Sequence, residues 1–425
     1  MKQKSLKMKI LYLLFLPLFL LANNLKEFID LSLNNENYLQ KQLQFSKSIL
    51  EQESVQNAYL PSLHLGVSYL GSNKDRFIIE PQESLMSTLS LKFLLFDGGN
   101  REAKIASMQS LKQLAHLEKE NMANYMALSA SVLYFNYLSL ESIIASDKQK
   151  EITLQNQLKR LENFYQAGLA SQSELESIRA KFELSSYELA QNELKLYELK
   201  NEIYNLSKTH FTPSFQNILQ EPNVEKNKNY EIALMQEKLN LENLKIDSAR
   251  AELFPKIFLQ NSFSFYDMNY NPKLPHELKS TSESFLKEHG QSNRFILAFE
   301  WKIFDFGANQ KALEAQKYTS KITQLELEKT KRKVDIELDN LLQEIEISKV
   351  KIKALNVSFK AANLAFESIE KKYSAGLCSY VEYLNALELK YKSQSQLELA
   401  KNEYEITKAR YYFTAGIDIK TKVLE

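Results

Sequence analysis

The feature that most constrains the fold is an internal repeat with constant spacing. The string Leu95–Gly99 (LFDGG) returns as Ile303–Gly307 (IFDFG), 208 residues later. A second string, Tyr165–Ser171 (YQAGLAS), returns as Tyr373–Ser379 (YSAGLCS) at the same offset. Because neither copy has an insertion between its two strings, their separation is fixed, which suits a rigid helix better than a loop-rich domain. The sequence therefore predicts one structural unit written twice.

The first residues have the pattern of a secretory signal peptide. Lysines at positions 2, 4, 7 and 9 precede an apolar stretch, Ile10–Leu21, and Ala22 is small enough for cleavage. The apolar stretch is too short to cross a bilayer comfortably, and no apolar run of 18 residues follows it, so we expect no conventional transmembrane helix. Without these four lysines the formal net charge falls from +1 to −3, which gives no reason to expect a nucleic-acid partner.

The composition argues against an enzyme. Nine glycines and eight prolines in 425 residues are too few for the turns of a compact catalytic domain. The five histidines are scattered without metal-ligand spacing, and there is no phosphate-binding glycine loop, so we expect no metal, no cofactor and no intrinsic energy source. The single cysteine, Cys378, excludes an intrachain disulfide.

Alternation of apolar and polar residues predicts four strands in two hairpins. The first hairpin follows a helix over residues 34–59 and Pro61, and the second follows a helix that starts near Tyr230 and stops before Pro255. The hairpins end at Asp97 and Asp305, and the second one is longer by 14 residues, which fit in a polar loop from about Asp267 to Ser292.

Long helices follow each hairpin. The stretches 100–165 and 308–373 contain neither proline nor glycine, and each would be about 100 Å long as one helix. Gly168 and Gly376 can end these helices in the left-handed conformation, and the Ser-x-x-Glu strings at 171–174 and 379–382 can cap the returning helices. The expected organisation is a signal peptide (1–22), a first repeat (23–208), a linker or equatorial segment (209–229), a second repeat (230–416) and a short tail (417–425).

Four strands cannot close a barrel, so the edges of this sheet would remain bare. The alternating faces suit a transmembrane barrel with a wet interior, built from several copies of the chain. We expect Trp301 to lie near the periplasmic interface in an aromatic girdle. The residues expected to face lipid are Phe93, Leu95, Phe295, Leu297, Phe299 and Trp301.

These features together resemble the TolC-like outer-membrane efflux proteins. The resemblance rests on the two strand-to-helix junctions, marked by Asp97, Gly98, Gly99, Asp305 and Gly307, on the two Ala-Gly-Leu turns, and on the proline that opens each hairpin. It implies a mixed fold: a long antiparallel α-helical barrel or coiled coil, with four strands per chain in a trimeric 12-stranded barrel. It also implies an outer-membrane location with a large periplasmic part, and as partners outer-membrane lipid, a periplasmic adaptor and an inner-membrane transporter.

The resemblance also assigns functional residues. The turns meet the adaptor at a tip made of Gly168, Leu169, Ala170, Ser171, Gly376, Leu377, Cys378 and Ser379. The tunnel of resembling proteins narrows just after the second turn, with acidic residues six and nine positions beyond its glycine. Here those positions are Glu382 and Asn385, so only the first matches, and Tyr373 is a candidate to tether a closed state. The alternative for Glu382 is a capping role alone, and the alternative for the tip is a pair of tight helical turns.

Two departures from the family pattern stand out. Phe306 replaces a glycine of the second junction, so we expect that turn to be stiffer or differently bent. The chain stops soon after Gly416, so we expect any belt around the middle of the tunnel to depend on Thr209–Asn229. Two functions remain open at this point: a passive export duct for drugs, metal ions or proteins, and a secreted coiled-coil structural or adhesive protein without a pore.

Overall fold

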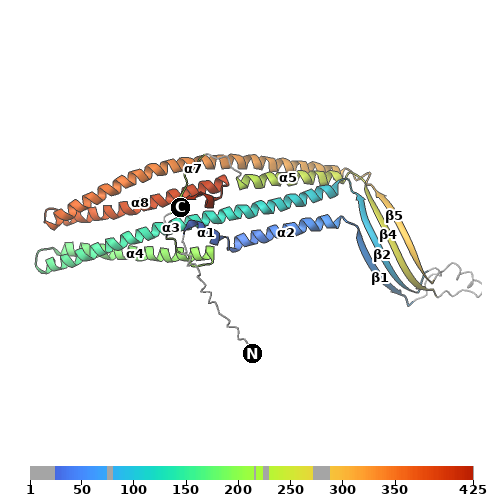
Figure 1. Cartoon of the computed structure of the whole chain (residues 1–425), viewed down its shortest axis with the longest axis horizontal. Helices are drawn as coiled ribbons and strands as arrows, with labels where there is room; N and C mark the ends of the chain where they lie inside the picture. The colour runs from blue at the N-terminus through green and yellow to red at the C-terminus, as the bar shows by residue number, and fades with distance from the viewer. Residues whose placement is uncertain (1–23, 74–79, 215–216, 224–228, 271–287, 425) are drawn as a thin grey trace, which may run out of the picture. The chain divides into compact units, whose positions relative to one another are not determined.

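The computed structural model describes residues 24–73, 80–214, 217–223, 229–270 and 288–424. The expected signal peptide, most of the long loop of the second hairpin and parts of the linker lie outside these residues. Two long helices dominate the chain (Figure 1): α3 (Asn100–Gln166) and α7 (Ala308–Ser374), each 67 residues long. Their return helices, α4 (Gln172–Ser207) and α8 (Tyr380–Ala415), are each 36 residues long, so the predicted repeat of long helices is confirmed.

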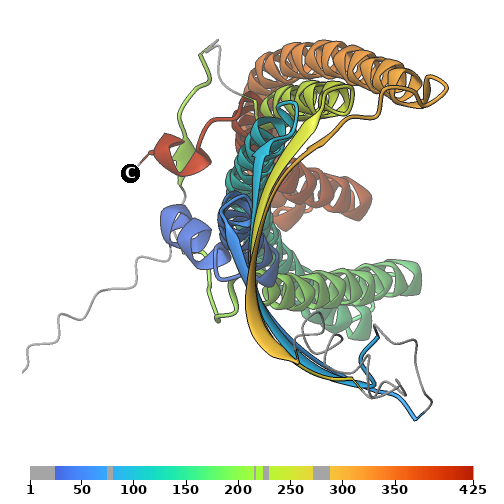
Figure 2. The ribbon, with the colours of Figure 1, turned by 90° about the vertical axis from the view of Figure 1, so that its right-hand side faces the viewer.

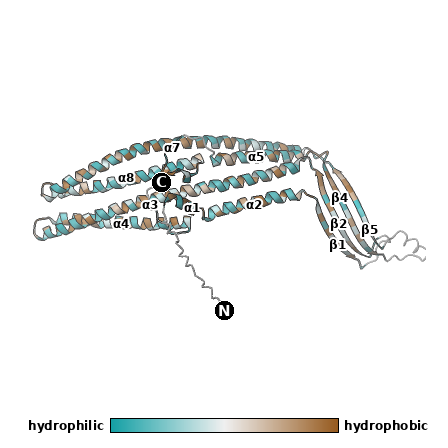
Figure 3. Ribbon diagram, viewed as in Figure 1, coloured by the Kyte–Doolittle hydropathy of each residue, from teal (hydrophilic) through white to brown (hydrophobic). Residues whose placement is uncertain are grey.

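Shorter helices precede each hairpin. They are α2 (Glu36–Ala58) in the first repeat and α5 (Tyr230–Ala251) in the second. An additional helix, α1 (Leu25–Ser32), was not predicted. Figure 3 shows hydrophobic and hydrophilic residues mixed along every long helix, as expected for helices that pack on one side and face water on the other.

The four predicted strands form one antiparallel sheet. They are β1 (Ser62–Gly71), β2 (Glu83–Phe96), β4 (Lys256–Asn269) and β5 (His289–Glu300), in the order β1-β2-β4-β5. Pairing of β2 with β4 joins the two hairpins, and Figure 2 shows the sheet as a curved band. Among the described residues, strands β1 and β5 each have one edge without a partner strand in this sheet, so this part of the chain presents two open edges.

The chain divides into two compact units that cut across the sequence repeats. One unit contains residues 1–39, 123–227 and 337–425, and the other contains residues 40–122 and 228–336. The sheet, α5 and α2 from residue 40 onward lie in the second unit, and α4 and α8 lie in the first. Each repeat therefore contributes segments to both units.

A core of buried side chains joins the linker and the C-terminal tail to the helices of the first unit. Phe28 of α1 stacks on Phe211 of the linker with ring centroids 4.7 Å apart, and Tyr134 of α3 packs in the same cluster. The linker strand β3 (Ile218–Leu219) pairs with the tail strand β6 (Val423–Leu424), which follows a short 3-10 helix, η1 (Ile419–Lys422). The linker and the tail are thus joined by strand pairing, whereas we expected any belt to depend on the linker alone.

Part of α3 is apolar enough, by length and composition, to cross a membrane. Half of that stretch is buried inside the structure, and α3 supplies Ala127, Ala130 and Tyr134 to the core of the first unit. Its apolar character is therefore explained by packing within the protein.

Candidate functional site

The sheet presents one apolar face that is exposed in the single chain. The register places Leu259 opposite Leu297, and Ile257 opposite Phe299. Because side chains alternate across a strand, these four residues and Phe295 share one face. The three that belong to β5, Phe295, Leu297 and Phe299, are each more than half exposed. Such a continuous apolar face needs a nonpolar environment.

The opposite face of the sheet is largely polar. Thr88 Oγ1 and Ser264 Oγ lie 2.9 Å apart across β2 and β4, and Lys92 lies opposite Gln260 in the same pair of strands. An apolar face backed by a polar one is the arrangement of a strand between lipid and a water-filled lumen.

Two of the residues expected to face lipid have local features that the sequence did not reveal. A register shift between Leu94 and Phe96 leaves Leu95 without a partner residue and places Phe96 opposite Ile257, so the register gives Phe96 the expected place of Leu95. Trp301 follows the last residue of β5, and its indole Nε1–H donates to the carbonyl oxygen of Leu253 at 3.1 Å. This half-exposed indole has an apolar ring and a satisfied polar atom.

The two strand-to-helix junctions share their backbone conformation. Gly98 and Phe306 occupy equivalent positions with φ values of +74° and +56°, and Gly99 and Gly307 also have positive φ. In the second junction the carboxylate of Asp305 accepts hydrogen bonds from the backbone N–H groups of Gly307 and Asn309, each at 3.0 Å. The aspartate thus satisfies donors that the start of α7 would otherwise leave open.

The two helical turns are built alike. The N–H of Gly168 donates to Tyr165 O and that of Leu169 to Phe164 O, and Gly376 and Leu377 make the equivalent bonds to Tyr373 and Lys372. This is the Schellman pattern, with glycine in the left-handed conformation. Leu169 and Leu377 are each 76 % exposed.

Both return helices begin with the predicted capping box. Ser379 Oγ accepts from the N–H of Glu382 at 3.2 Å, and Glu382 Oε2 accepts from Ser379 N–H at 2.9 Å. Ser171 and Glu174 make the same bonds at the first turn. The side chains of Glu382 and Asn385 are exposed, and in this box both bonds to the Glu382 carboxylate are made by Oε2.

Tyr373 lies in an aromatic cluster behind the second turn. Its ring stacks on that of Tyr383 with centroids 4.8 Å apart, and the guanidinium of Arg160 lies 5.7 Å from the Tyr373 ring centroid. Burial raises the pKa of the Tyr373 hydroxyl, while Arg160 acts in the opposite direction. The structure thus brings Tyr373 close to Arg160 of α3, a neighbour that the sequence analysis did not identify.

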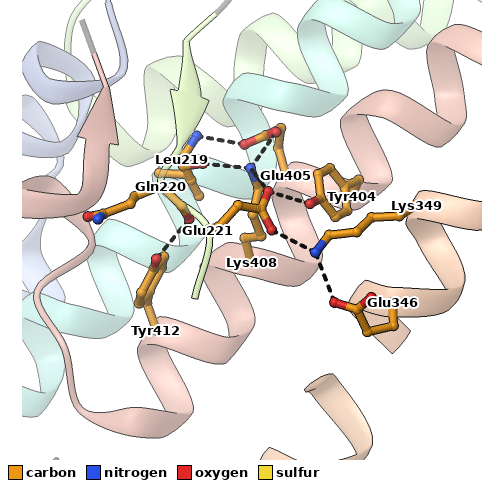
Figure 4. Close-up of polar contacts among 9 residues, drawn as sticks. All are labelled: Leu219, Gln220, Glu221, Glu346, Lys349, Tyr404, Glu405, Lys408 and Tyr412. Carbon is orange, nitrogen blue, oxygen red and sulfur yellow. Dashed lines mark hydrogen bonds and ion pairs between the residues drawn. The ribbon is translucent and has the colours of Figure 1, made fainter. Parts of the chain in front are cut away.

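A buried ion pair that the sequence analysis missed holds the linker against α8 (Figure 4). The Lys408 ammonium is fully buried and lies 2.7 Å from Glu405 Oε1, and it donates to the carbonyl oxygen of Leu219 at 2.6 Å. Glu405 Oε2 accepts from the N–H of Leu219 at 2.7 Å. Burial raises the pKa of the Glu405 carboxyl, although Lys408 acts in the opposite direction.

A second carboxylate extends this network toward the surface. Glu221 accepts a hydrogen bond from the Tyr404 hydroxyl, and its Oε2 lies 3.1 Å from Lys349 Nζ. The Tyr412 hydroxyl donates to Gln220 O at 2.8 Å. Among the described residues, no group of three or more histidine, cysteine, aspartate or glutamate side chains is placed to hold a metal ion.

Comparison with known proteins identifies the class of this architecture. Residues 223–416 match the family of outer membrane efflux proteins. The match begins in the linker and ends at Gly416, which caps α8. No curated protein has a significant sequence match to this chain.

Solved structures share the fold over nearly the whole chain. CusC, described in crystal structures of folding and transmembrane channel formation, is 17 % identical over 93 % of each chain, with a TM-score of 0.79. The Campylobacter jejuni CmeC outer membrane channel is 16 % identical over 92 % of this chain and 85 % of that chain, with a TM-score of 0.80. The outer membrane protein VceC from Vibrio cholerae is 15 % identical over 93 % of this chain and 96 % of that chain, with a TM-score of 0.76.

The likeness to solved structures shows the fold, and the family match over residues 223–416 supports the function. The resemblance to TolC-like outer-membrane efflux proteins is confirmed, together with the predicted mixed fold of long helices and a membrane β-domain. The outer-membrane location is confirmed as well. The family match supports the role of an efflux channel rather than that of an enzyme or of a secreted coiled coil without a pore.

Proposed function

We propose that this chain is an outer-membrane efflux channel that works as a homotrimeric, passive duct. The observation that carries the proposal is the four-stranded sheet, which has an exposed apolar face and two open edges. Pairing of β5 in one copy with β1 in the next would satisfy both edges, and three copies give 12 strands. The long helices α3 and α7 continue from the strands and would line the periplasmic tunnel.

The duct has no energy source of its own, so we propose an inner-membrane transporter and a periplasmic adaptor as partners. Drugs, metal ions and proteins are all possible cargo for such a machine. The proposed adaptor contact is the tip, residues 168–171 and 376–379. Its support is the exposure of Leu169 and Leu377, because an apolar side chain held at the end of a tight turn has little local surface on which to pack.

Charge at the tip tests the adaptor contact. Leu169→Glu with Leu377→Glu should abolish export and leave trimers intact, because the Schellman bonds use only the backbone of these two residues. Export from cells and heat-modifiable trimers on gels measure the two effects. Ser173→Glu is the control, since it adds one negative charge at an exposed polar position in the first turn of α4, two residues beyond the tip, and should export normally. Loss of trimers together with export would show that the leucines serve packing alone.

We also propose that Glu382 forms an acidic constriction near this end of the duct. Three copies would place three carboxylates around one axis, which favours cations and binds divalent ions. Tyr373 is the proposed tether of the closed state, and Asn385 would contribute a neutral ring nearby. The support for Glu382 is its exposure, together with a capping box in which Oε2 makes both bonds.

Replacing Glu382 by glutamine separates the constriction from the cap. Gln can keep the capping hydrogen bond while it removes the charge, so thermal stability should be unchanged while cation selectivity and divalent block weaken. Reversal potentials in planar bilayers measure the selectivity. Glu174→Gln makes the same change in the equivalent capping box of the first turn and should leave selectivity unchanged. A Glu382→Gln channel that conducts like the parent would reduce Glu382 to a cap.

A further inference from the structure

An exposed aromatic pair marks the second strand-to-helix junction. The rings of Phe304 and Phe306 lie 4.7 Å apart, and Phe306 is 89 % exposed. Phe306 also has φ +56°, a left-handed conformation that is unfavourable for a residue with a side chain. A strained, exposed phenylalanine at a turn calls for an explanation, because glycine would fit the backbone better.

The first junction shows what the equivalent position contacts. Gly98 lies against the turn that ends α5, and a Cβ on Gly98 would come within 2.5 Å of the carbonyl oxygen of Ala251 and 2.7 Å of Phe254 Cβ. Only glycine allows this close approach. The first junction of the chain therefore packs on the end of the pre-hairpin helix of the second repeat.

The pre-hairpin helix of the first repeat ends in the same turn. Leu60 N–H donates to Asn57 O at 3.0 Å, as Phe254 N–H donates to Ala251 O at 3.1 Å, and a proline follows each. Leu60 is 61 % exposed. This turn of α2 leads into β1 and the Phe306 junction follows β5, so the two lie at opposite ends of the strand order β1-β2-β4-β5.

We propose that Phe306, supported by Phe304, packs on the Asn57–Leu60 turn of α2 in a second copy of this chain. The inference rests on the proposed trimer, in which the junction after β5 comes next to the start of β1 in the neighbouring copy. The intrachain contact of Gly98 with Ala251 and Phe254 is its template.

The proposal has a geometric consequence. A side chain does not fit at the spacing of the intrachain junction, so the junction between copies is wider and the phenylalanine rings fill it. At its strand-to-helix junctions, the proposed trimer therefore has three tight contacts within chains and three wider contacts between chains. Phe306 fixes the position of each copy relative to the next.

Intermolecular cross-linking tests the contact. In a Cys378→Ser background, Leu60→Cys with Phe306→Cys should be converted by a short bismaleimide into covalent dimers and trimers that survive boiling in detergent. Leu43→Cys with Phe306→Cys is the control, because Leu43 is equally exposed but lies about 25 Å earlier along α2. After treatment with the same bismaleimide and boiling in detergent, this control variant should run as a monomer. Native trimers without cross-links at positions 60 and 306 would overturn the contact and leave the proposed trimer standing, whereas a parent chain that forms no trimers would overturn both.

A glycine at position 306 gives a second and independent result. Phe306→Gly restores the residue of the first junction and relieves the left-handed strain, so a purely local turn residue would leave trimers equally or more resistant to heat. The proposed contact predicts the opposite: trimers of Phe306→Gly should dissociate at a lower temperature than those of the parent. Trimers of unchanged or greater heat resistance would overturn it.

Discussion

At the scale of single residues, Lys408 and Glu405 make the least expected contact of the molecule. The ammonium and the carboxylate are both buried, and together they bind the backbone N–H and C=O of Leu219. A buried pair of opposite charges contributes little net stability compared with apolar residues, but removal of one partner leaves an uncompensated charge. The pair therefore fixes where the linker attaches to α8.

We predict that Lys408→Met lowers the free energy of unfolding by about 3–5 kcal/mol, because Glu405 would remain buried without its cation. The double variant Lys408→Met with Glu405→Gln should recover much of this loss, since a neutral amide oxygen can still accept from Leu219 N–H. Thermal unfolding followed by circular dichroism measures both. A double variant as unstable as the single one would contradict the charge explanation.

The stability of the Lys408→Met variant should depend on pH in a defined direction. Burial raises the pKa of Glu405 in the folded chain, and loss of Lys408 removes an opposing influence. A carboxyl whose folded pKa lies above its unfolded value binds its proton more readily when folded, so stability rises as pH falls from the raised pKa toward the ordinary value. Lys408→Met should thus regain stability under mildly acidic conditions, and the double variant should not.

Local patterns predicted some residues of the candidate site and missed others. The Ser-x-x-Glu strings correctly predicted both capping boxes, because that chemistry depends on residues three positions apart. Glu405 and Lys408 carry no comparable local signal. They look like one more charged pair on a solvated helix, and only the position of Leu219, some 190 residues earlier, buries them.

At the scale of elements, the facing of the strands can be tested directly. Leu297 lies on the apolar face opposite Leu259, and Ala298 lies on the other face opposite Phe258. We predict that Leu297→Arg impairs membrane insertion by about 2–4 kcal/mol if it lies at the middle of the bilayer, whereas Ala298→Arg is mild. The yield of folded, heat-modifiable protein in the outer membrane measures the difference. Equal tolerance at both positions would refute the facing.

The strands were predictable because a period of two is visible within a few residues, and the register confirms one antiparallel sheet. The shift at Leu95 was not predictable, since a bulge changes the pairing without changing the apolar pattern of Leu94, Leu95 and Phe96. Helix α1 was missed for a different reason: its stability comes from Leu25, Phe28 and Ile29 buried in a core assembled from distant segments.

At the scale of the whole molecule, repetition in sequence does not correspond to the compact units. The offset of 208 residues correctly predicts two equal sets of long helices, because it fixes their lengths. It does not predict that each repeat contributes to both compact units. Helices α3 and α7 each contribute residues to both units, with boundaries at residues 122/123 and 336/337.

As a passive duct, this chain should conduct ions across the outer membrane. Single-channel recording of the purified oligomer in planar bilayers tests it most directly. We expect discrete conductance steps that favour cations and that divalent ions block from the side of the Glu382 carboxylates. An oligomer that inserts into the bilayer but shows no conductance under any applied voltage would contradict it.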